Sequence, residues 1–230
     1  MLDLSGREAV VTGGTGALGS AVVGRLVLAG AIVHVPIFAP RELDGFPYRG
    51  HDSVKLHEGL DLSIEADVAR LFDATTSLYA SIHLAGGFAM GPISTTSLDV
   101  WEHLMRINAT TCFLSCREAV KTMQGREGRI VNVAARPVIV PAGQMTAYSA
   151  SKAAVAALTL SLAEELSSSS IWVNAIVPSI IDTPANRAAM PDANYDAWPK
   201  PDEIAETIAF LASPENAVTR GALVPVYGKS

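Results

Sequence analysis

The chain has 230 residues, a formal net charge of −6 and 49% hydrophobic residues. This length and apolar content predict a single domain with a large core over residues 1–230. The acidic balance argues against nucleic acid and against an anionic membrane as partners, because either would require a basic face. The N-terminus lacks a secretory signal pattern and no apolar run reaches membrane-spanning length, so we expect a cytoplasmic protein.

Short apolar runs alternate along the chain with longer segments of helical periodicity. The runs predict strands at Glu8–Val11, Ala31–Ile37, Ser53–His57, Ser81–Ala85, Arg129–Ala134, Ile171–Val177 and Leu223–Val226. The periodic segments predict helices at Ala17–Gly30, Ile64–Leu78, Leu98–Met123, Thr146–Leu166 and Pro201–Ala212. Several strands are apolar almost throughout, which is typical of parallel strands buried on both faces. The alternation predicts an α/β fold: a doubly wound, mostly parallel seven-stranded sheet of the Rossmann type, with helices on both faces.

Two proline-rich stretches interrupt this alternation. Residues 36–52 contain three prolines and two glycines, so any helix between the second and third strands must be short or absent. Residues 178–200 contain four prolines and are too long for a simple connection. We interpret this second stretch as a substrate lid.

The two cysteines, Cys112 and Cys116, lie four residues apart on a predicted helix and therefore share a face of it. Their number does not imply a disulfide framework. With no other His or Cys nearby in the sequence, we expect buried free thiols and no metal site.

A glycine-rich turn, Thr12–Gly19, follows the first predicted strand and opens the first predicted helix. In such a setting a nucleotide pyrophosphate sits on the helix N-terminus, where free N–H groups and the helix dipole meet its negative charge. Gly14, Gly16 and Gly19 have the spacing of dinucleotide-binding turns, in which glycine permits the tight turn and close backbone approach. The turn therefore predicts dinucleotide binding. The alternative is a glycine-rich turn without a ligand.

A tyrosine and a lysine begin the fourth predicted helix. The spacing of four between Tyr148 and Lys152 puts the phenol and the ammonium on one helix face. An unperturbed Tyr has a pKa of about 10, and a nearby cation lowers it. The pair is suited to general acid–base chemistry; by itself it also fits an ordinary surface helix.

Together, the glycine turn and the Tyr-x-x-x-Lys spacing resemble the short-chain dehydrogenase/reductase family over nearly the whole chain. The resemblance implies an NAD- or NADP-dependent oxidoreductase with a small-molecule substrate. In it, Tyr148 exchanges the substrate proton, Lys152 holds the nicotinamide ribose and lowers the tyrosine pKa, and Asn108 binds a water linking Lys152 to solvent. It implies cofactor contacts from Gly13, Gly14, Thr15, Gly16, Ala17, Leu18, Gly19, Asp61, Leu62, Ala85, Gly86, Gly87, Lys152, Pro178, Ile181 and Thr183. Because the family often pairs through two long helices, we expect a homodimer or homotetramer.

The serine that this family carries thirteen residues before its tyrosine is replaced by Ala135. Loss of such a donor to a developing oxyanion typically costs about 2.7–4 kcal/mol. The dihydropteridine reductase branch also tends to lack this serine, and the chain resembles it at Ala85–Ala89 and in the lid. That resemblance implies a quinonoid dihydropterin substrate that stacks on Phe88 and lies near Ala135, Tyr148 and Trp198. The alternative for Phe88 and Trp198 is packing of the lid against the body.

The choice between NAD and NADP stays open. An NAD enzyme usually has an acid about 20 residues beyond the glycines for the ribose 2′-hydroxyl, whereas here the nearest acid is Glu42, beyond Pro40. Arg41 is suited to pair with the 2′-phosphate of NADP, or it is a solvated loop charge. A different class of function also stays open: a catalytically weak nucleotide-binding scaffold or sensor, given Ala135 in place of the serine.

Overall fold

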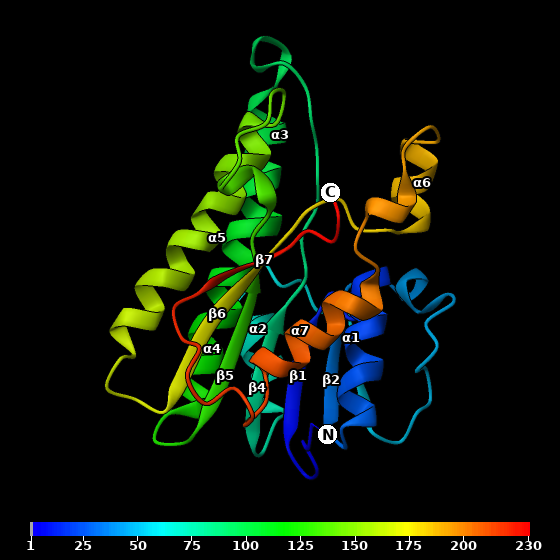
Figure 1. The fold of residues 1–230 in the computed structure, drawn as a ribbon. Helices are drawn as coiled ribbons and strands as arrows, with labels where there is room; N and C mark the ends of the chain where they lie inside the picture. Colours follow the sequence, from blue (N-terminus) through cyan, green and yellow to red (C-terminus); the bar gives the residue numbers. More distant parts are fainter. Residues whose placement is uncertain (1) are drawn as a thin grey trace.

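Seven strands form one parallel sheet in the computed structural model, which describes residues 2–230 and so leaves Met1 of the predicted domain outside (Figure 1). They are β1 (Glu8–Thr12), β2 (Ile32–Ile37), β3 (Val54–Glu58), β4 (Leu78–His83), β5 (Gly128–Val133), β6 (Ile171–Pro178) and β7 (Leu223–Val226). The order β3-β2-β1-β4-β5-β6-β7 confirms the predicted doubly wound sheet, and every pairing is parallel. The order reverses between β1 and β4, which is where sheets of this kind bind ligands, beyond the strands' carboxyl ends.

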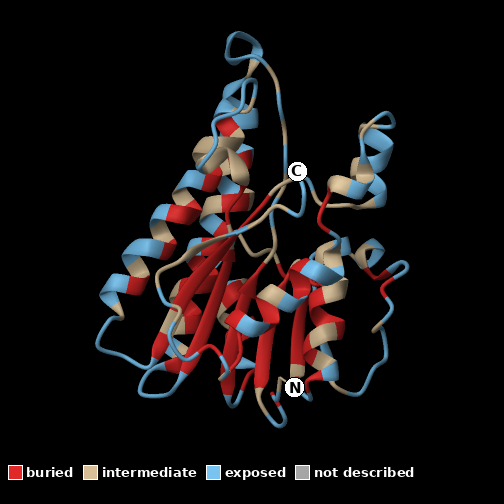
Figure 2. Ribbon diagram, viewed as in Figure 1, coloured by how far each residue is buried: buried red, intermediate tan, exposed pale blue. Residues whose placement is uncertain are grey.

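Helices cover both faces of the sheet. One buried cluster joins α1 (Ala17–Leu28) and α7 (Pro201–Leu211) to the first face, and a second joins α2 (Glu65–Asp73), α4 (Thr111–Met123) and α5 (Thr146–Glu165) to the other. Figure 2 shows β1, β2, β4, β5 and β6 buried almost throughout, while the outward helix faces are exposed. Within residues 2–230, no helix combines the length and apolar character needed to cross a bilayer. The layers therefore match the predicted Rossmann-type architecture.

The boundary between α2 and β4 differs from the prediction. The helix ends at Asp73, well short of the predicted Leu78, which instead begins β4. The cause lies in β1, because the Glu8 carboxylate accepts hydrogen bonds from the backbone N–H groups of Thr76 and Ser77 at 2.7 and 2.9 Å. This long-range contact holds a turn where helical periodicity continued in the sequence, and β4 consequently starts and ends earlier than predicted.

The predicted helix Leu98–Met123 is continuous but changes its winding. It begins as α3 (Leu98–Leu104), passes through a π-helical segment (Met105–Thr110) and continues as α4. Such π segments often mark functional sites. This one contains Asn108, a predicted site residue.

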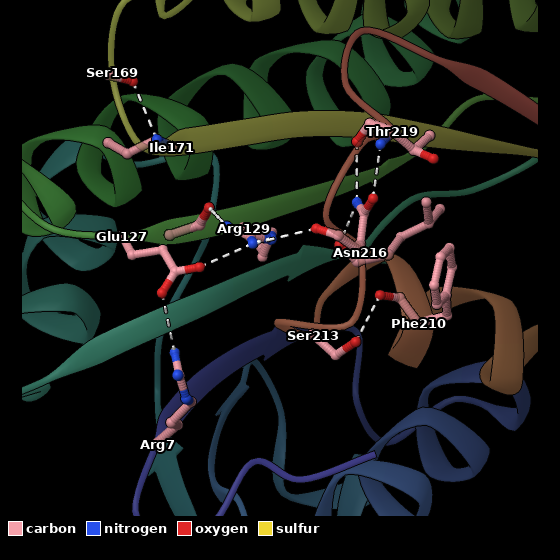
Figure 3. A network of polar contacts seen from close by, with 11 residues as sticks. Arg7, Glu127, Arg129, Ser169, Ile171, Phe210, Ser213, Asn216 and Thr219 are labelled. Atoms are coloured by element: carbon pink, nitrogen blue, oxygen red, sulfur yellow. Dashed lines mark hydrogen bonds and ion pairs between the residues drawn. The ribbon is translucent and has the colours of Figure 1, made fainter. Parts of the chain in front are cut away.

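A buried arginine, Arg129, lies at the amino-terminal end of the parallel strands, opposite their carboxyl ends (Figure 3). Arg129 at the start of β5 donates to the Glu127 carboxylate at 2.9 Å and to the Asn216 carbonyl at 3.3 Å. Its guanidinium lies 4.6 Å from the ring centroid of Trp172. Charge pairing and stacking compensate the burial of this cation, so we assign it a structural role.

Two histidines pair across neighbouring strands at the β2–β3 edge of the sheet. His34 Nδ1 lies 3.0 Å from His57 Nε2, and the rings stack. Burial lowers the pKa of both imidazoles, and His57 and Lys55 add to the effect on His34 while Glu8 opposes it. The folded state therefore keeps both rings neutral at a pH where the unfolded chain, with a pKa near 6.5, already binds protons.

We expect the free energy of unfolding to be fully retained above about pH 6.5 and to fall as the pH drops towards the lowered folded-state pKa values. Each differential proton contributes at most about 1.4 kcal/mol per pH unit. Urea unfolding of the wild type and of His34→Gln between pH 5 and 7.5 would isolate this contribution from that of the carboxylates. An identical pH dependence in the two proteins would contradict the assignment.

Candidate active site

The predicted glycine turn forms a narrow cradle between β1 and α1, at the point where the strand order reverses. Gly13 has a φ of +67°, and a Cβ there would come within 2.8 Å of the Ala85 nitrogen at the end of β4. A Cβ on Gly19 would overlap the Gly13 carbonyl oxygen. Gly16 caps α1 without any side-chain hydrogen bond, which leaves the first backbone N–H groups free for an anion. The cradle therefore fits the pyrophosphate of a dinucleotide.

The remaining predicted cofactor residues of the amino-terminal half lie at the same sheet edge. Thr12 Oγ1 accepts a hydrogen bond from the Ala85 nitrogen at 3.2 Å, which ties the ends of β1 and β4 together. The Leu60 nitrogen donates to the Ile37 carbonyl at 3.1 Å, which brings Asp61 and Leu62 beside the end of β2. The positions predicted to contact the adenine thus lie beside the end of β2, the strand that pairs with β1.

The Tyr148 ring lies in the first turn of α5. It meets the Phe88 ring edge to face, with 4.9 Å between the centroids. Burial raises the pKa of the Tyr148 phenol to about 12. This is the reverse of the lowering predicted from Lys152. The physical reason is that desolvation disfavours the phenolate, while the Lys152 ammonium is directed at a backbone carbonyl.

Lys152 lies one turn further along α5 and is 7% exposed. Its Nζ donates to the Val133 carbonyl at the end of β5, at 2.9 Å. Burial lowers the Lys152 pKa to about 8, although the Cys112 sulfur acts in the opposite direction. The ammonium therefore remains mostly charged at neutral pH.

Asn108 fastens the loop after β4 to α5. Its Nδ2 donates to the Gly87 carbonyl and to Ser151 Oγ, and its Oδ1 accepts from the Gly87 nitrogen, each at 3.0 Å. A Cβ on Gly86 would overlap Asn108 Oδ1, which explains the glycine there. Since both side-chain N–H groups are used, Asn108 acts as a positioning residue here, and the water predicted beside it stays a prediction.

The position of the missing serine is closed by packing. Ala134 and Ala135 are 1% and 3% exposed. Arg136, the next residue, lies with its guanidinium 5.1 Å from the ring centroid of Tyr227. Neither alanine offers a hydrogen-bond donor to a substrate oxygen.

The predicted lid, residues 178–200, folds into a small unit that stands above α1 and α7 (Figure 1). Its helix α6 (Pro184–Ala189) is capped by Thr183 Oγ1, which accepts from the Asn186 nitrogen at 3.2 Å. Pro178 ends β6, and the Ile181 carbonyl accepts from Asn186 Nδ2 at 2.8 Å, so these predicted cofactor positions lie at the lid's base.

Phe88 and Trp198, both predicted to face the substrate, differ in exposure. Phe88 is 57% exposed beside Tyr148 and remains available to a ligand. Trp198 is 7% exposed and packs against Tyr195 within the lid, with 5.1 Å between the centroids. The structure therefore places Trp198 in the packing of the lid and not on an open substrate face.

The carboxyl end of β2 holds the two charged residues relevant to cofactor choice. Glu42 is drawn back onto the chain, where its carboxylate accepts from the Ala39 nitrogen at 3.2 Å and from Phe38 at 3.4 Å. Arg41 is exposed and makes no ion pair with any residue in the range 2–230. The Glu42 carboxylate is thus hydrogen-bonded to the backbone, whereas Arg41 is exposed to solvent.

Sequence reasoning missed a hollow beside α5. A cavity of about 160 Å³ is lined by Met90, Thr96, Gln144 and Met145, among others. Gln144 has a φ of +61°, and its carbonyl accepts from the Gly91 nitrogen at 2.7 Å. A non-glycine residue held in this conformation often marks a functional site. The signal is invisible in the sequence because it depends on a contact between two distant loops.

The chain is similar to known reductases and dehydrogenases. A family model described as Enoyl-(Acyl carrier protein) reductase matches residues 18–228. The chain is 32% identical to a 3-beta-hydroxysteroid dehydrogenase of Comamonas testosteroni, over 95% of this chain and 93% of that protein. It is 29% identical to 3beta-hydroxysteroid dehydrogenase 1 of Eggerthella lenta, over 98% and 94% of the two proteins.

The fold is also similar to that of a solved protein of this kind. A short-chain type dehydrogenase/reductase from Mycobacterium ulcerans superposes with a TM-score of 0.91 at 26% identity, covering 99% of this chain and 90% of that one. None of these three proteins is a dihydropteridine reductase, so they support the wider family and not that branch. The chain belongs to the short-chain dehydrogenase/reductase family and is an NAD(P)-dependent oxidoreductase.

Proposed function

We propose that the protein reduces a carbonyl or a conjugated ring with NAD(P)H, and that Tyr148 donates the proton. The observation that carries this proposal is the position of Tyr148 and Lys152 on one face of α5, at the sheet edge that also holds the glycine cradle. The nicotinamide cofactor, when bound, supplies the hydride. The chain itself binds the cofactor, orients the substrate and donates the proton.

The roles follow from the contacts of each group. The N–H groups at the start of α1 bind the pyrophosphate. Lys152, anchored on the Val133 carbonyl, directs its remaining N–H bonds to the nicotinamide ribose. Asn108 holds Gly86 and Gly87 against α5 and so shapes the wall between cofactor and substrate.

Protonation of Tyr148 favours the reductive direction. A pKa raised to about 12 keeps the phenol protonated at neutral pH, which suits a general acid and opposes a general base. A carbonyl oxygen or a ring nitrogen that gains negative charge during hydride transfer would raise its own proton affinity and take this proton.

The substrate class we favour within this activity is a flat conjugated ring, such as a quinonoid dihydropterin. Two observations support it over a simple ketone. Ala135 offers no oxyanion donor, and a conjugated ring spreads the developing charge over several atoms, so it needs that donor less than a ketone does. The exposed Phe88 ring, set against Tyr148, gives such a ring an aromatic surface on which to stack.

A substrate panel tests the proposal. We expect oxidation of NADH or NADPH to be faster with a quinonoid dihydropterin than with aliphatic or aryl ketones. Phe88→Leu, which keeps an apolar side chain but removes the aromatic face, should raise the KM for the ring substrate by about 2- to 13-fold, because stacking of this kind contributes about 0.5–1.5 kcal/mol. Faster turnover of ketones would contradict the ring substrate and indicate ordinary carbonyl reduction.

The same panel tests the scaffold alternative. Tight cofactor binding measured by calorimetry, without cofactor oxidation by any pterin or carbonyl compound, would favour a nucleotide-binding scaffold or sensor.

For the cofactor, we expect NADPH to bind more tightly than NADH. Arg41 is free to meet a 2′-phosphate, whereas the Glu42 carboxylate is already engaged by backbone N–H groups. Arg41→Ala should weaken NADPH binding by about 10-fold, the loss of one charge-assisted contact of roughly 1.4 kcal/mol. NADH binding is the internal control and should stay unchanged. Equal losses of affinity for NADPH and NADH would show that Arg41 does not contact the 2′-phosphate.

We also propose a homodimer or homotetramer that forms through α4 and α5. Their outward face carries Ala153, Ala157 and Leu160 on α5 and Phe113 on α4, all exposed. Small side chains let two helices approach closely and bury the larger apolar ones. Sedimentation of the intact protein would separate these assemblies from a monomer.

A further inference from the structure

A cluster of metal-ligating side chains lies in the core, outside the roles described above. His83 ends β4, and Cys112 and Cys116 face it from one side of α4. All three are buried, and their ligand atoms lie within 4.8 Å of one another. The sequence led us to expect no metal site because no histidine adjoins the cysteines. The sheet topology supplies that histidine.

The distances resemble those of a tetrahedral zinc site. Cys116 Sγ lies 3.5 Å from His83 Nδ1. Bonds of about 2.3 Å to sulfur and 2.0 Å to nitrogen at a tetrahedral angle separate the two ligand atoms by about 3.5 Å. Asn132 Oδ1 is a fourth donor atom, 2.8 Å from His83 Nδ1 and 3.5 Å from Cys116 Sγ. His83 Nδ1 and Asn132 Oδ1 would have to move slightly apart for an ion to bind both of them.

Neighbouring groups orient these ligands independently of the cysteines. Ser81 Oγ lies 2.7 Å from His83 Nε2 and is able to accept a hydrogen bond from an Nε2–H group, which would leave Nδ1 free to bind a metal. Asn132 Nδ2 donates to Thr159 Oγ1 at 2.9 Å, and this contact turns Oδ1 towards His83 and Cys116. Metal-binding histidines are usually held by such a partner on the other ring nitrogen.

We propose that His83, Cys112, Cys116 and Asn132 form a structural zinc site. Two thiolates balance the charge of Zn²⁺, so the loaded site is neutral in a buried environment. Zinc binding would release the two thiol protons to solvent, while the His83 proton moves from Nδ1 to Nε2, where the N–H donates a hydrogen bond to Ser81 Oγ. No oxidation or reduction is involved. Thiolate and imidazole ligands together suit zinc among the common cellular cations.

The experiment uses the full chain, unfolded and refolded with Zn²⁺ or with Co²⁺ as a spectroscopic substitute, because the site is closed in the folded protein. We expect about one metal per chain by elemental analysis. The cobalt form should show thiolate-to-metal charge-transfer absorption and the visible bands of tetrahedral coordination. Zinc should also raise the Tm relative to protein refolded with a chelator.

Variants link these readouts to the site. Cys112→Ser and Cys116→Ser, close in size to the native residues, should reduce the bound metal at least 10-fold and abolish the charge-transfer band. His103→Gln, an exposed histidine on α3, is the matched control and should bind metal like the wild type. Circular dichroism confirms that each variant is folded.

Two results would overturn the proposal. One is a refolded wild type without stoichiometric metal whose two thiols both react with a thiol reagent on unfolding. The other is metal retention in Cys116→Ser equal to that of the wild type. None of these readouts depends on oxidoreductase activity, so the outcome is independent of the proposed reaction.

Discussion

Replacement of Tyr148 by phenylalanine is expected to lower kcat by about 10²–10⁴-fold, the usual contribution of a positioned general acid. The reason is that Ala134 and Ala135 offer no alternative donor, and the Tyr148 phenol is protonated at neutral pH. Cofactor binding should remain within about 2-fold of the wild type, because Lys152 and the glycine cradle are unchanged. Steady-state kinetics with the best panel substrate, together with a cofactor titration, would measure both quantities.

Tyr79→Phe is the matched control for this variant. The Tyr79 hydroxyl is also buried, and desolvation likewise raises its pKa to about 12. It lies near the beginning of β4, at the opposite end of the strands from Tyr148 and Lys152. Loss of this hydroxyl should leave kcat unaltered. Undiminished turnover in Tyr148→Phe would show that another group protonates the substrate.

Gly19→Ala is expected to lower stability, whereas Gly16→Ala should weaken cofactor binding while leaving the fold intact. A methyl group at Gly19 would overlap the Gly13 carbonyl, which is rigid backbone. Overpacking costs about 1–3 kcal/mol, and each kcal/mol lowers the Tm by about 2–4 °C in a chain of this size. A shift of several degrees should therefore be visible by thermal unfolding.

The neighbouring Gly16 supplies the internal comparison. A Cβ there would meet the Gly13 oxygen at 3.5 Å, an ordinary contact, and its φ of −69° suits any residue. The methyl group would instead stand on the helix N-terminus where the pyrophosphate approaches. We expect a Kd for the cofactor at least 10-fold higher and a Tm within about 2 °C of the wild type. Wild-type cofactor affinity in Gly16→Ala would place the pyrophosphate elsewhere.

Some features of this protein were predictable because they depend on neighbours in the chain. The turn Thr12–Gly19 needs only a strand before it and a helix after it. The Tyr148–Lys152 pair needs only the pitch of one helix. The alternation of apolar runs and periodic segments likewise led to a doubly wound, mostly parallel seven-stranded sheet through general packing rules, and the structure confirms it.

Other features depend on contacts between distant residues. The end of α2 is set by Glu8, which captures the turn at Thr76 and Ser77 from another strand. The direction of the Tyr148 pKa follows from how deeply the ring is buried, and the sequence spacing alone suggested the reverse. For Trp198 the sequence left open whether it faces a substrate or packs between the lid and the body, and in the structure it packs against Tyr195 within the lid.

The amino-acid sequence alone determined the class of fold, the glycine turn and the placement of Tyr148 and Lys152 on one helix face, because local geometry specifies the turn and the helix face, and the alternation of apolar runs specifies the fold class. Only the tertiary structure brought His83 to Cys112 and Cys116, and only it turned Asn108 onto Gly87. The physical reason is that hydrogen bonding and desolvation depend on which atoms surround a group in space. In a parallel sheet those atoms come from strands and helices separated by long crossovers of the chain.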